Sequence, residues 1–349
     1  MVLMGACLAL IVYAGQRIYG TIGPSRAFAA ADGSLYLLSH GRIHVFGADG
    51  RRRQVIDLQA LGVHPRPSDF EVHRDGRIVT TDPNDSLLNR CAVPSGPCER
   101  LDLGLRTGVA QEVRRLNAAK IHIDEAGQRY YVSDNSGHSV VIADFGGKVL
   151  GRSEPGTFRY PNELAVRKPG TLSVVDTNHW RVATFDVKGD HFGANLGNLW
   201  VGGPGILPKS PRITRPGRYW PFDSVVLPDG ETWVLIAREG MRDADLIVFG
   251  ADGKPVKRID LGDDSDPFDI EIWKDRVIVS DATNYRVEGL DLSGNRVAAF
   301  DDPAFAQELD EARALPQRWK MIRVAAQVTL MLTPFVALIL AYRRRKPAP

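Results

Sequence analysis

The sequence lacks most of the features that would assign a function directly. It has no Gly-x-Ser-x-Gly elbow, no His-Glu-x-x-His zinc motif, no phosphate-binding glycine loop and no dinucleotide fingerprint, so no motif indicates a common enzyme class. Its formal charge is only +2, which argues against a dedicated nucleic-acid binder. No stretch before the C-terminal part has helical periodicity, which excludes a helical bundle. Glycine (34) and proline (22) are plentiful, as expected where tight turns join many short strands, and the pattern predicts an all-β chain with helical ends.

Cysteine is also scarce, with three residues in the whole chain. Cys7 lies in the apolar N-terminal segment, while Cys91 and Cys98 flank the turn Ala-Val-Pro-Ser-Gly-Pro. A Cys91–Cys98 disulfide would indicate an oxidising compartment. The alternative is a pair of free thiols near a hairpin. No second pair of Cys or His accompanies them, so the spacing fits no zinc motif.

The C-terminal part contains the one long uncharged run. Val324 to Tyr342 carry no charge, and at about 1.5 Å per residue such a helix comes close to the ~30 Å hydrocarbon core of a bilayer. Four basic residues, Arg343 to Lys346, follow at once. The sequence therefore predicts a juxtamembrane helix or linker at 303–320, a transmembrane helix at 321–342 and a basic cytoplasmic tail at 343–349. The alternative is a buried core helix.

The N-terminal segment, residues 1–20, is apolar as well and lacks a basic start. We predict an uncleaved membrane anchor or signal-anchor there. With both ends cytoplasmic, the domain between them would face the periplasm or the cell exterior, held at the inner (plasma) membrane. A disulfide could persist in that location.

Between the two ends, residues 21–302 repeat one phrase: a short β stretch, a turn, a second β stretch ending near Asp, and a third. The phrase is clearest in Asp176-Thr-Asn-His-Trp-Arg181 and Asp281-Ala-Thr-Asn-Tyr-Arg286, with their flanking strands. Weaker copies begin near Arg26, Ser68, Ala119 and Pro221. A period of about 40–50 residues with several short strands per unit indicates a β-propeller. The sequence thus predicts six blades, each with four strands.

These phrases resemble the NHL-repeat family, whose units read roughly Pro-x-Gly-Ile-Ala-Val and then Val-x-Asp-Thr-x-Asn-x-Arg-Val. The chain is distantly similar to the gluconolactonase and senescence-marker types of propeller. The resemblance implies a six-bladed β-propeller. It leaves function open, because members include lactone hydrolases, a zinc-dependent lyase, RNA-binding modules and extracellular sensor domains. The Asp and Asn of the phrase favour tight turns by bonding the local backbone, and Arg181 and Arg286 are expected to pair with carboxylates.

The first strand of each repeat, expected beside the central channel, carries unusual polar residues at two positions. The first position holds Arg26, Asp69, Lys120, Glu163, Asp223 and Asp269. The second position holds Phe28, Glu71, His122, Ala165, Val225 and Glu271. Residues two apart on a strand point to the same face, so both sets should line one end of the channel.

Several like charges need a cation or a ligand to offset them. We therefore predict that this mouth binds Ca²⁺ or another divalent cation, or a polar small molecule. The predicted ligand-binding residues are Asp69, Glu71, Lys120, His122, Glu163, Asp223, Asp269 and Glu271. The alternative is a water-filled channel in which the acids pair with Lys120, Arg26 and backbone groups. The resemblance to lactone hydrolases implies a metal held by Glu71, Asn162, Asp223 and Glu271.

A second candidate site is the connection between the fourth and fifth repeats, from Gly193 to Trp220, which has no acidic residue. Long loops on compact scaffolds are often functional, and basic groups with aromatics suit anionic lipid headgroups, a glycan or a partner protein. Its predicted binding residues are Trp200, Lys209, Arg212, Arg215, Arg218, Tyr219 and Trp220. The alternative is an insertion used for packing.

These observations favour a membrane-tethered extracytoplasmic propeller that serves as a binding or scaffold module. Its expected partners are the membrane and either another membrane or periplasmic protein or a polar small molecule, and no nucleic acid. The alternative is a metal-dependent hydrolase or lyase, lactonase-like, acting at the acidic channel mouth. A signal sensor is less well supported, because only seven residues follow Tyr342.

Overall fold

The structure is a computed structural model of the chain. The residues that it describes are 2–20, 23–82, 87–103, 120–135, 137–201, 219–237, 243–262 and 265–344. They form two compact units. One contains Met1–Gly23 and Pro303–Pro349, and the other contains Pro24–Asp302.

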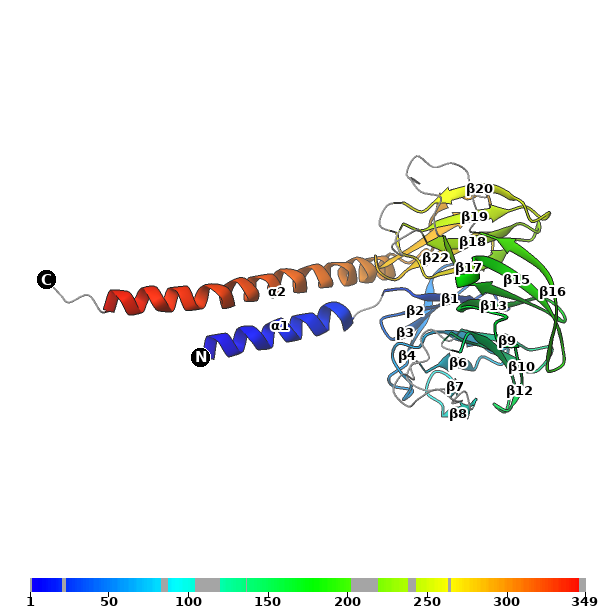
Figure 1. Cartoon of the computed structure of the whole chain (residues 1–349), viewed down its shortest axis with the longest axis horizontal. Helices are drawn as coiled ribbons and strands as arrows, with labels where there is room; N and C mark the ends of the chain where they lie inside the picture. Colours follow the sequence, from blue (N-terminus) through cyan, green and yellow to red (C-terminus); the bar gives the residue numbers. More distant parts are fainter. Residues whose placement is uncertain are drawn as a thin grey trace. The chain divides into compact units, whose positions relative to one another are not determined.

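In the second unit the described residues form six antiparallel sheets of four strands, each built from four strands consecutive in the chain. The first strand of each sheet lies next to the first strands of the neighbouring sheets, which makes a ring. Figure 1 shows β1, β9, β13 and β17 toward the middle of this unit and β8, β16 and β20 at its periphery. The predicted all-β, six-bladed propeller with four-stranded blades is confirmed.

The blades follow one another in chain order, and their strands are these. Blade 1 contains β1 (Arg26–Ala29), β2 (Leu35–Ser39), β3 (Arg42–Phe46) and β4 (Arg52–Asp57). Blade 2 contains β5 (Phe70–Val72), β6 (Ile78–Thr81), β7 (Leu87–Cys91) and β8 (Cys98–Asp102). Blade 3 contains β9 (Ile121–Asp124), β10 (Arg129–Asp134), β11 (Ser139–Asp144) and β12 (Val149–Arg152).

The second half of the ring repeats the arrangement with longer strands in blade 4. Blade 4 contains β13 (Pro161–Lys168), β14 (Thr171–Asp176), β15 (Arg181–Lys188) and β16 (His191–Trp200), with the 3₁₀ turn η1 (Thr177–His179) after β14. Blade 5 contains β17 (Trp220–Val226), β18 (Thr232–Ala237), β19 (Asp245–Phe249) and β20 (Pro255–Asp260). Blade 6 contains β21 (Asp269–Trp273), β22 (Arg276–Asp281), β23 (Arg286–Asp291) and β24 (Arg296–Val297).

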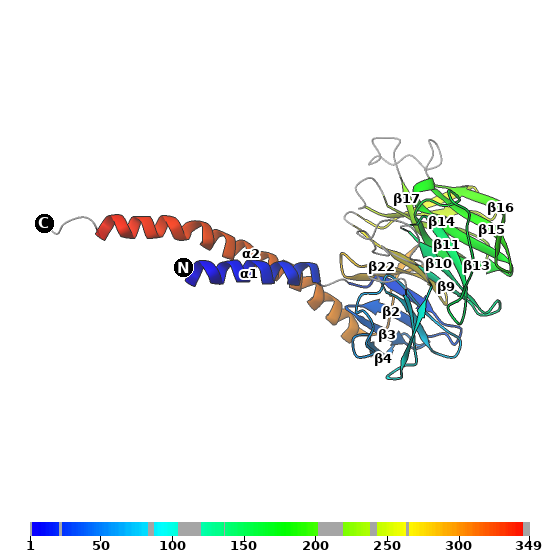
Figure 2. The same cartoon turned by 60° about the horizontal axis from the view of Figure 1, so that its bottom comes forward.

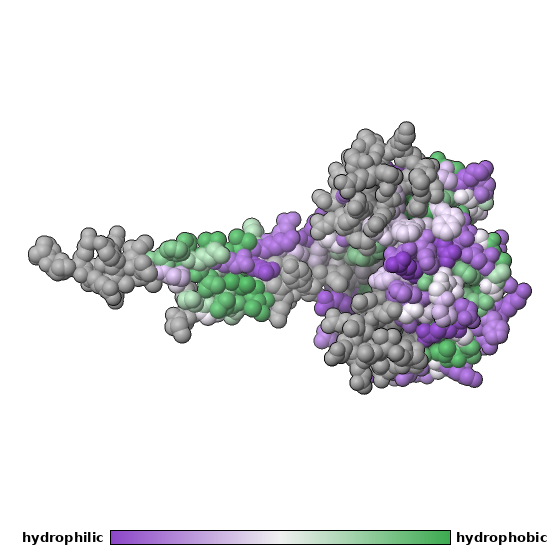
Figure 3. All heavy atoms as spheres, in the orientation of Figure 1, coloured by the Kyte–Doolittle hydropathy of each residue, from purple (hydrophilic) through white to green (hydrophobic). Residues whose placement is uncertain are grey.

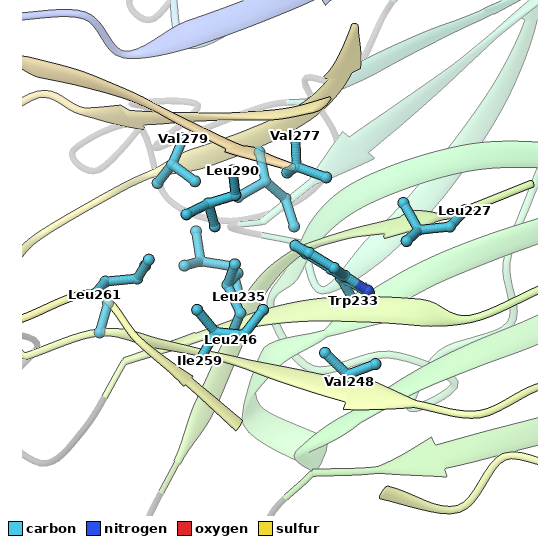
Figure 4. Packing of buried hydrophobic residues seen from close by; sticks show 12 residues of the cluster. Leu227, Trp233, Leu235, Leu246, Val248, Ile259, Leu261, Val277, Val279 and Leu290 are labelled. Carbon is cyan, nitrogen blue, oxygen red and sulfur yellow. The ribbon is translucent and has the colours of Figure 1, made fainter. Parts of the chain in front are cut away.

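The hydrophobic core lies between neighbouring blades, because each sheet is apolar on both faces and a single sheet cannot bury them. Between blades 5 and 6, Trp233 and Leu235 of β18 pack against Val277 and Val279 of β22, as Figure 4 shows. Equivalent clusters join blades 1 and 2, 2 and 3, 3 and 4, and 4 and 5. Burying this surface stabilises the ring at roughly 25 cal/mol per Å² of apolar area.

All four strands of blade 6 come from the C-terminal end of the propeller sequence, so blade 6 shares no strand with blade 1. The ring is closed by contacts between the end of the propeller sequence and blade 1. Phe300 stacks on Phe46 with ring centroids 4.3 Å apart. The Asp301 amide donates to the Gly50 carbonyl (3.2 Å), and an Asp302 carboxylate oxygen accepts from the Arg52 amide (3.1 Å). Gly50 adopts φ +81, and a Cβ there would lie 3.0 Å from the Asp301 nitrogen, so the closure requires glycine.

The Asp of the repeated phrase stabilises turns, as predicted. Asp176 accepts from the Arg159 amide (2.7 Å) and from the Arg181 guanidinium (2.9 Å). Asp281 accepts from the Asn284 amide (3.0 Å) in the same way. Arg286, in contrast, is exposed at the surface. The phrase is therefore explained by turn structure in these two blades.

The other unit consists of two helices, α1 (Val2–Gly20) and α2 (Pro303–Arg344). They pack through an edge-to-face contact between Tyr13 and Trp319, with ring centroids 5.4 Å apart. Ala14 and Ala326 are buried there. Hydrophobic residues cover much of the described surface of both helices, as Figure 3 shows. The juxtamembrane segment at 303–320, predicted as a helix or linker, is helical, and it continues into the segment at 321–342 as one helix, α2, which includes Pro316 and Pro334.

No helix in the described part of the chain is both long enough and apolar enough to span a bilayer. The predicted span continues past Phe335, and the side chains from residue 336 onward lie outside the described residues, as does the tail from residue 345. The transmembrane helix and the N-terminal anchor stay predictions.

Candidate functional site

The structure brings the six first-position residues together at the propeller axis, where their side chains are buried. We call this group the axis cluster, and its members are Arg26, Asp69, Lys120, Glu163, Asp223 and Asp269. Arg26 and Asp269 begin the inner strands of their blades, Asp69 and Lys120 immediately precede theirs, and Glu163 and Asp223 lie within theirs. Because the inner strands run in the same direction around the axis, equivalent positions reach the same level.

Arg26 is the centre of the axis cluster. Its Nε lies 2.7 Å from Asp69 Oδ1, and its two terminal nitrogens bond both oxygens of Glu163, at 2.8 and 3.0 Å. Nη1 also donates to Asp269 Oδ1 at 2.6 Å and lies 3.7 Å from Asp223 Oδ2. One guanidinium from blade 1 thus contacts carboxylates of blades 2, 4, 5 and 6. The planar fork of arginine suits such shared, charge-assisted bonds better than lysine would.

The aspartates of the axis cluster also bond the backbone of the next blade. Asp69 Oδ2 accepts from the Ile121 amide at 2.8 Å, and Asp223 Oδ2 accepts from the Ile270 amide at 2.8 Å. Asp269 Oδ2 accepts from the Ala27 amide at 2.7 Å. The inner strand is a sheet edge, so its amides facing the next blade need acceptors once they are buried. These carboxylates supply them and join blade 2 to 3, 5 to 6, and 6 to 1.

Burial changes the proton affinity of these carboxylates. Loss of hydration raises the pKa of Asp69 to about 6 and raises the pKa of Asp269, although Arg26 opposes both shifts. The pKa of Asp223 lies well above its ordinary value because of burial and then repulsion from Glu163. Such shifts follow when the charged form loses its hydration and gains too little attraction in return.

Glu163 behaves in the opposite way. Burial alone would raise the pKa of Glu163, but the attraction of Arg26 and Lys120 outweighs it and holds the pKa below its usual range. Lys120 Nζ lies 3.8 Å from Glu163 and 3.9 Å from Asp69. Two cations therefore face four carboxylates in the axis cluster, so full ionisation would leave an uncompensated negative charge in a dry site.

The second-position residues lie along the same axis, and all of them except Glu71 are more accessible. Glu71 is buried, its Oε1 lies 3.1 Å from His122 Nδ1, and its Oε2 accepts from the Ile123 amide at 2.6 Å. Burial disfavours the charged form of His122, yet Glu71 raises its pKa above the ordinary value. Glu271 is partly buried, and burial followed by repulsion from Asp269 places its pKa well above the usual range. Phe28, Ala165 and Val225 are also partly buried.

The metal ligands implied by the family resemblance do not fit a metal site in this structure. Asn162 Oδ1 accepts from Asn135, and its amide nitrogen donates to Thr177 Oγ1, in a separate network. The oxygens of Asp223 accept from the Ser224 and Ile270 amides, and those of Glu71 are also engaged. Within the described residues, no three His, Cys, Asp or Glu side chains are grouped as a metal ion requires.

The second candidate site needs a correction, because its first part is not a loop. Residues Gly193 to Trp200 belong to β16, the outer strand of blade 4. The sequence pattern missed this strand because Gly and Asn, which are usually found in turns, replace β-branched residues along it. Trp200 is 52% exposed, and the Arg181 guanidinium lies 6.0 Å from its ring centroid.

The rest of the predicted binding loop divides between described and undescribed residues. Tyr219 is buried in the core between blades 4 and 5, and Trp220 begins β17 and is partly buried. The four basic residues lie outside the described residues: Lys209, Arg212, Arg215 and Arg218.

Cys91 and Cys98 form a disulfide between the paired strands β7 and β8, with Cα atoms 4.1 Å apart. They end one strand and begin the next, so the bond spans the β7–β8 turn. It braces the outer part of blade 2.

One buried polar network was missed from the sequence. His73 is buried, with Nδ1 3.0 Å from Glu125 and Nε2 2.7 Å from the Tyr130 hydroxyl. The Arg90 guanidinium donates to the same hydroxyl at 3.3 Å. His73 continues the alternation of Asp69 and Glu71, which was the available signal. The network joins blades 2 and 3 beneath the surface.

No protein-family model matches the chain, and no curated protein matches it either. Among solved structures, it is similar to a catalytically inactive virginiamycin B lyase from Staphylococcus aureus with quinupristin (11% identity, TM-score 0.52, covering 79% of this chain and 84% of that one). It is also similar to the hydrazine synthase of Kuenenia stuttgartiensis (13%, 0.52, 78% and 78%). A third similar structure is a nidogen/laminin complex (14%, 0.50, 80% and 92%). At these identities the likeness extends to the propeller fold alone.

Proposed function

We propose that this chain is a membrane-tethered, extracytoplasmic propeller of NHL type that binds a partner protein or a polar ligand and serves as a scaffold. One observation carries the proposal. The buried polar groups at the axis, where a propeller enzyme would hold reacting groups, are engaged with one another and with backbone amides. Groups committed to joining blades are poorly suited to catalysis, which needs a carboxylate or histidine within reach of a substrate.

The proposed location rests on two further features. The Cys91–Cys98 disulfide suits an oxidising compartment such as the periplasm. The uncharged run from Val324 to Tyr342 and the apolar segment at 2–14 suit attachment at the inner (plasma) membrane by both ends.

The location is tested by protease treatment of cells carrying the full chain. We expect the propeller to resist protease in intact Gram-negative cells and to be degraded once the outer membrane is opened. We also expect alkaline carbonate to leave the chain in the membrane pellet. Resistance in opened cells, or release by carbonate, would contradict the proposed topology.

A metal-dependent hydrolase or lyase is the second candidate, and one observation favours it. Glu271 and His122 are partly accessible along the axis, with raised pKa values that suit proton transfer. The test is metal analysis of the full chain in detergent beside a Glu71→Gln/Glu271→Gln double variant, followed by assays with lactones and a streptogramin. Stoichiometric metal lost from the variant, with turnover that follows it, would replace the scaffold proposal. We expect neither.

A further inference from the structure

The outer strand of blade 4, β16, differs in length from every other outer strand that the structure describes. It has ten residues, whereas β4, β8, β12, β20 and β24 have two to six. Its inner side pairs with β15, and within the described residues no strand pairs with its outer side. Figure 2, turned from the view of Figure 1, also shows β16 at the outside of the propeller. An edge of this length presents a row of backbone donors and acceptors to solvent.

β16 also lacks the charge that protects the other outer edges. Each of the other described outer strands contains at least one Arg or Lys, as in Lys257 and Arg258 of β20. The sequence of β16, His-Phe-Gly-Ala-Asn-Leu-Gly-Asn-Leu-Trp, contains none, and no Asp or Glu either. Charged side chains on an edge prevent pairing with another edge, and Lys and Arg are the residues most used for this purpose.

Two large apolar side chains of β16 are open to solvent. Leu196 is 57% exposed and Trp200 is 52% exposed. Val256 of β20 is equally exposed, at 58%, but it stands beside two basic residues. The combination of a free edge, no charge and exposed apolar groups therefore occurs on β16 and not on β20.

The geometry of β16 limits how much of it can pair. Its register with β15 is irregular at Phe185, and Asn195 bonds the Gly197 amide locally at 2.9 Å. From Gly197 to Trp200 the pairing with β15 is regular. Bulges shorten the usable edge, so strand pairing here is expected to be short and reversible.

We propose that β16 pairs antiparallel with the β16 of a second copy of this chain, about a two-fold axis near Gly197. The absence of charge favours this occupant, because an uncharged strand meets its own copy without repulsion. A two-fold axis makes the contact self-complementary and closed, so two copies associate and no fibre follows. Leu196 and Trp200 of each copy then cover apolar surface of the other. A contact this small is below the ~1,000 Å² of a stable interface, so the dimer is weak in solution and is favoured where copies are concentrated.

Site-directed cross-linking of the full chain tests this proposal. In a Cys7→Ser background, Gly197→Cys, where an added Cβ meets no atom within 4 Å, is compared with Val256→Cys, an exposed position on another outer strand. We expect mild oxidation to give a disulfide-linked species of twice the chain mass, at least several-fold more from the β16 variant, because a residue on the two-fold axis lies opposite its own copy and within disulfide reach. Equal cross-linking from Val256→Cys would overturn the proposal.

A second pair of variants separates a loss of strand pairing between copies from a loss of folding. Leu196→Lys puts like charges beside the two-fold axis, and we expect it to reduce the dimer fraction in light scattering at least several-fold, while Val256→Lys leaves it unchanged. Thermal melting of both variants verifies that the propeller is intact. Equal dimer fractions in the two variants, or cross-links from β16 to a protein of another mass in place of a doubled chain, would overturn self-association.

Discussion

The axis and the outer edge of blade 4 differ in where their charged residues lie. At the axis, five other ionisable side chains are buried around Arg26, where burial is most costly for charge. On β16, which is open to solvent, no Lys, Arg, Asp or Glu is present. Globular proteins usually show the reverse. Buried, paired charges favour one arrangement of the blades, because other arrangements would leave a charge unpaired. An edge strand without charge, in contrast, can pair with another strand. The axis cluster thus favours one closed ring, whereas β16 is open to pairing.

The largest effect is expected from Arg26→Met, which leaves four carboxylates at the axis without their shared cation. Removing one partner of a buried ion pair costs about 3–5 kcal/mol, and we expect a loss of this size in the free energy of unfolding. Denaturant titration of the full chain in detergent, followed by near-UV circular dichroism, measures it. The control is Arg286→Ala, at an exposed position, which should change stability by less than about 0.5 kcal/mol. Similar losses from both variants would remove the distinction between axis and surface.

The Cys91–Cys98 disulfide is a covalent link at the outer part of blade 2, and its contribution to stability can be compared with that of the ion pairs at the axis. Closing a loop this short restricts the unfolded chain by about 2–3 kcal/mol. We expect the Cys91→Ser/Cys98→Ser double variant to lose about that much stability and to become insensitive to reductant. Melting temperatures with and without dithiothreitol measure both effects. A wild-type chain unaffected by complete reduction would show that blade 2 does not need this bond.

Two neighbouring acids of the axis cluster should respond differently to the same change. Asp269 bonds Arg26 at 2.6 Å, so Asp269→Asn loses a charge-assisted bond and about 2 kcal/mol. Asp223 lies 3.7 Å from Arg26, and its pKa is already well above the ordinary value. The raised pKa means that Asp223 is poorly stabilised as an anion, so Asp223→Asn loses little and keeps an oxygen for the Ile270 amide. Stability should therefore change little or rise. Equal losses in denaturant titrations would mean that the axis needs every charge.

The smallest effect concerns pH. Asp69, Asp223, Asp269 and Glu271 have raised pKa values in the folded chain, so they lose their protons at higher pH than in the unfolded chain, where carboxyl groups ionise near pH ~4. Their contribution to stability is therefore complete at acidic pH and is lost as the pH rises through the folded-state pKa, which for Asp69 is about 6. For Asp69 alone the loss between pH 5 and pH 8 is about 1 kcal/mol.

Glu163 acts in the opposite direction, because its pKa is lowered, but its contribution is lost only as the pH falls below the ordinary range of a glutamate. Melting temperatures across pH 5 to 8 should thus decline, and Glu271→Gln should make the decline shallower. A stability that rises over this range would show that the cluster is ionised and compensated in the folded chain.

Local signals in the sequence were sufficient for the architecture. Asp176 and Asp281 end the second strand of their blades in turns that the residue types dictate, and the alternating apolar residues of strands such as β14 and β22 require two covering neighbours. The prediction treated β16 as part of a loop, because its Gly and Asn residues hide its pairing with β15. Its identity as a strand depends on its partner more than on its own composition.

The candidate site was predicted in part. The alternation of residues two apart placed the acids at the axis, which follows from the strand period alone. That Arg26 would contact four of them could not be read from the chain, because Arg26 and Asp269 are 243 positions apart and meet only when the ring closes. The bonds of these acids to amides of the next blade likewise depend on which N–H groups are left at each inner edge.

The sequence by itself determined that this chain folds into six four-stranded blades with an apolar segment at each end, because turn chemistry and strand alternation act over a few residues. Only the tertiary structure decided that the acidic positions surround one arginine and that one outer edge is left without charge. Those properties depend on which distant strands become neighbours, and a short-range pattern carries no information about that choice.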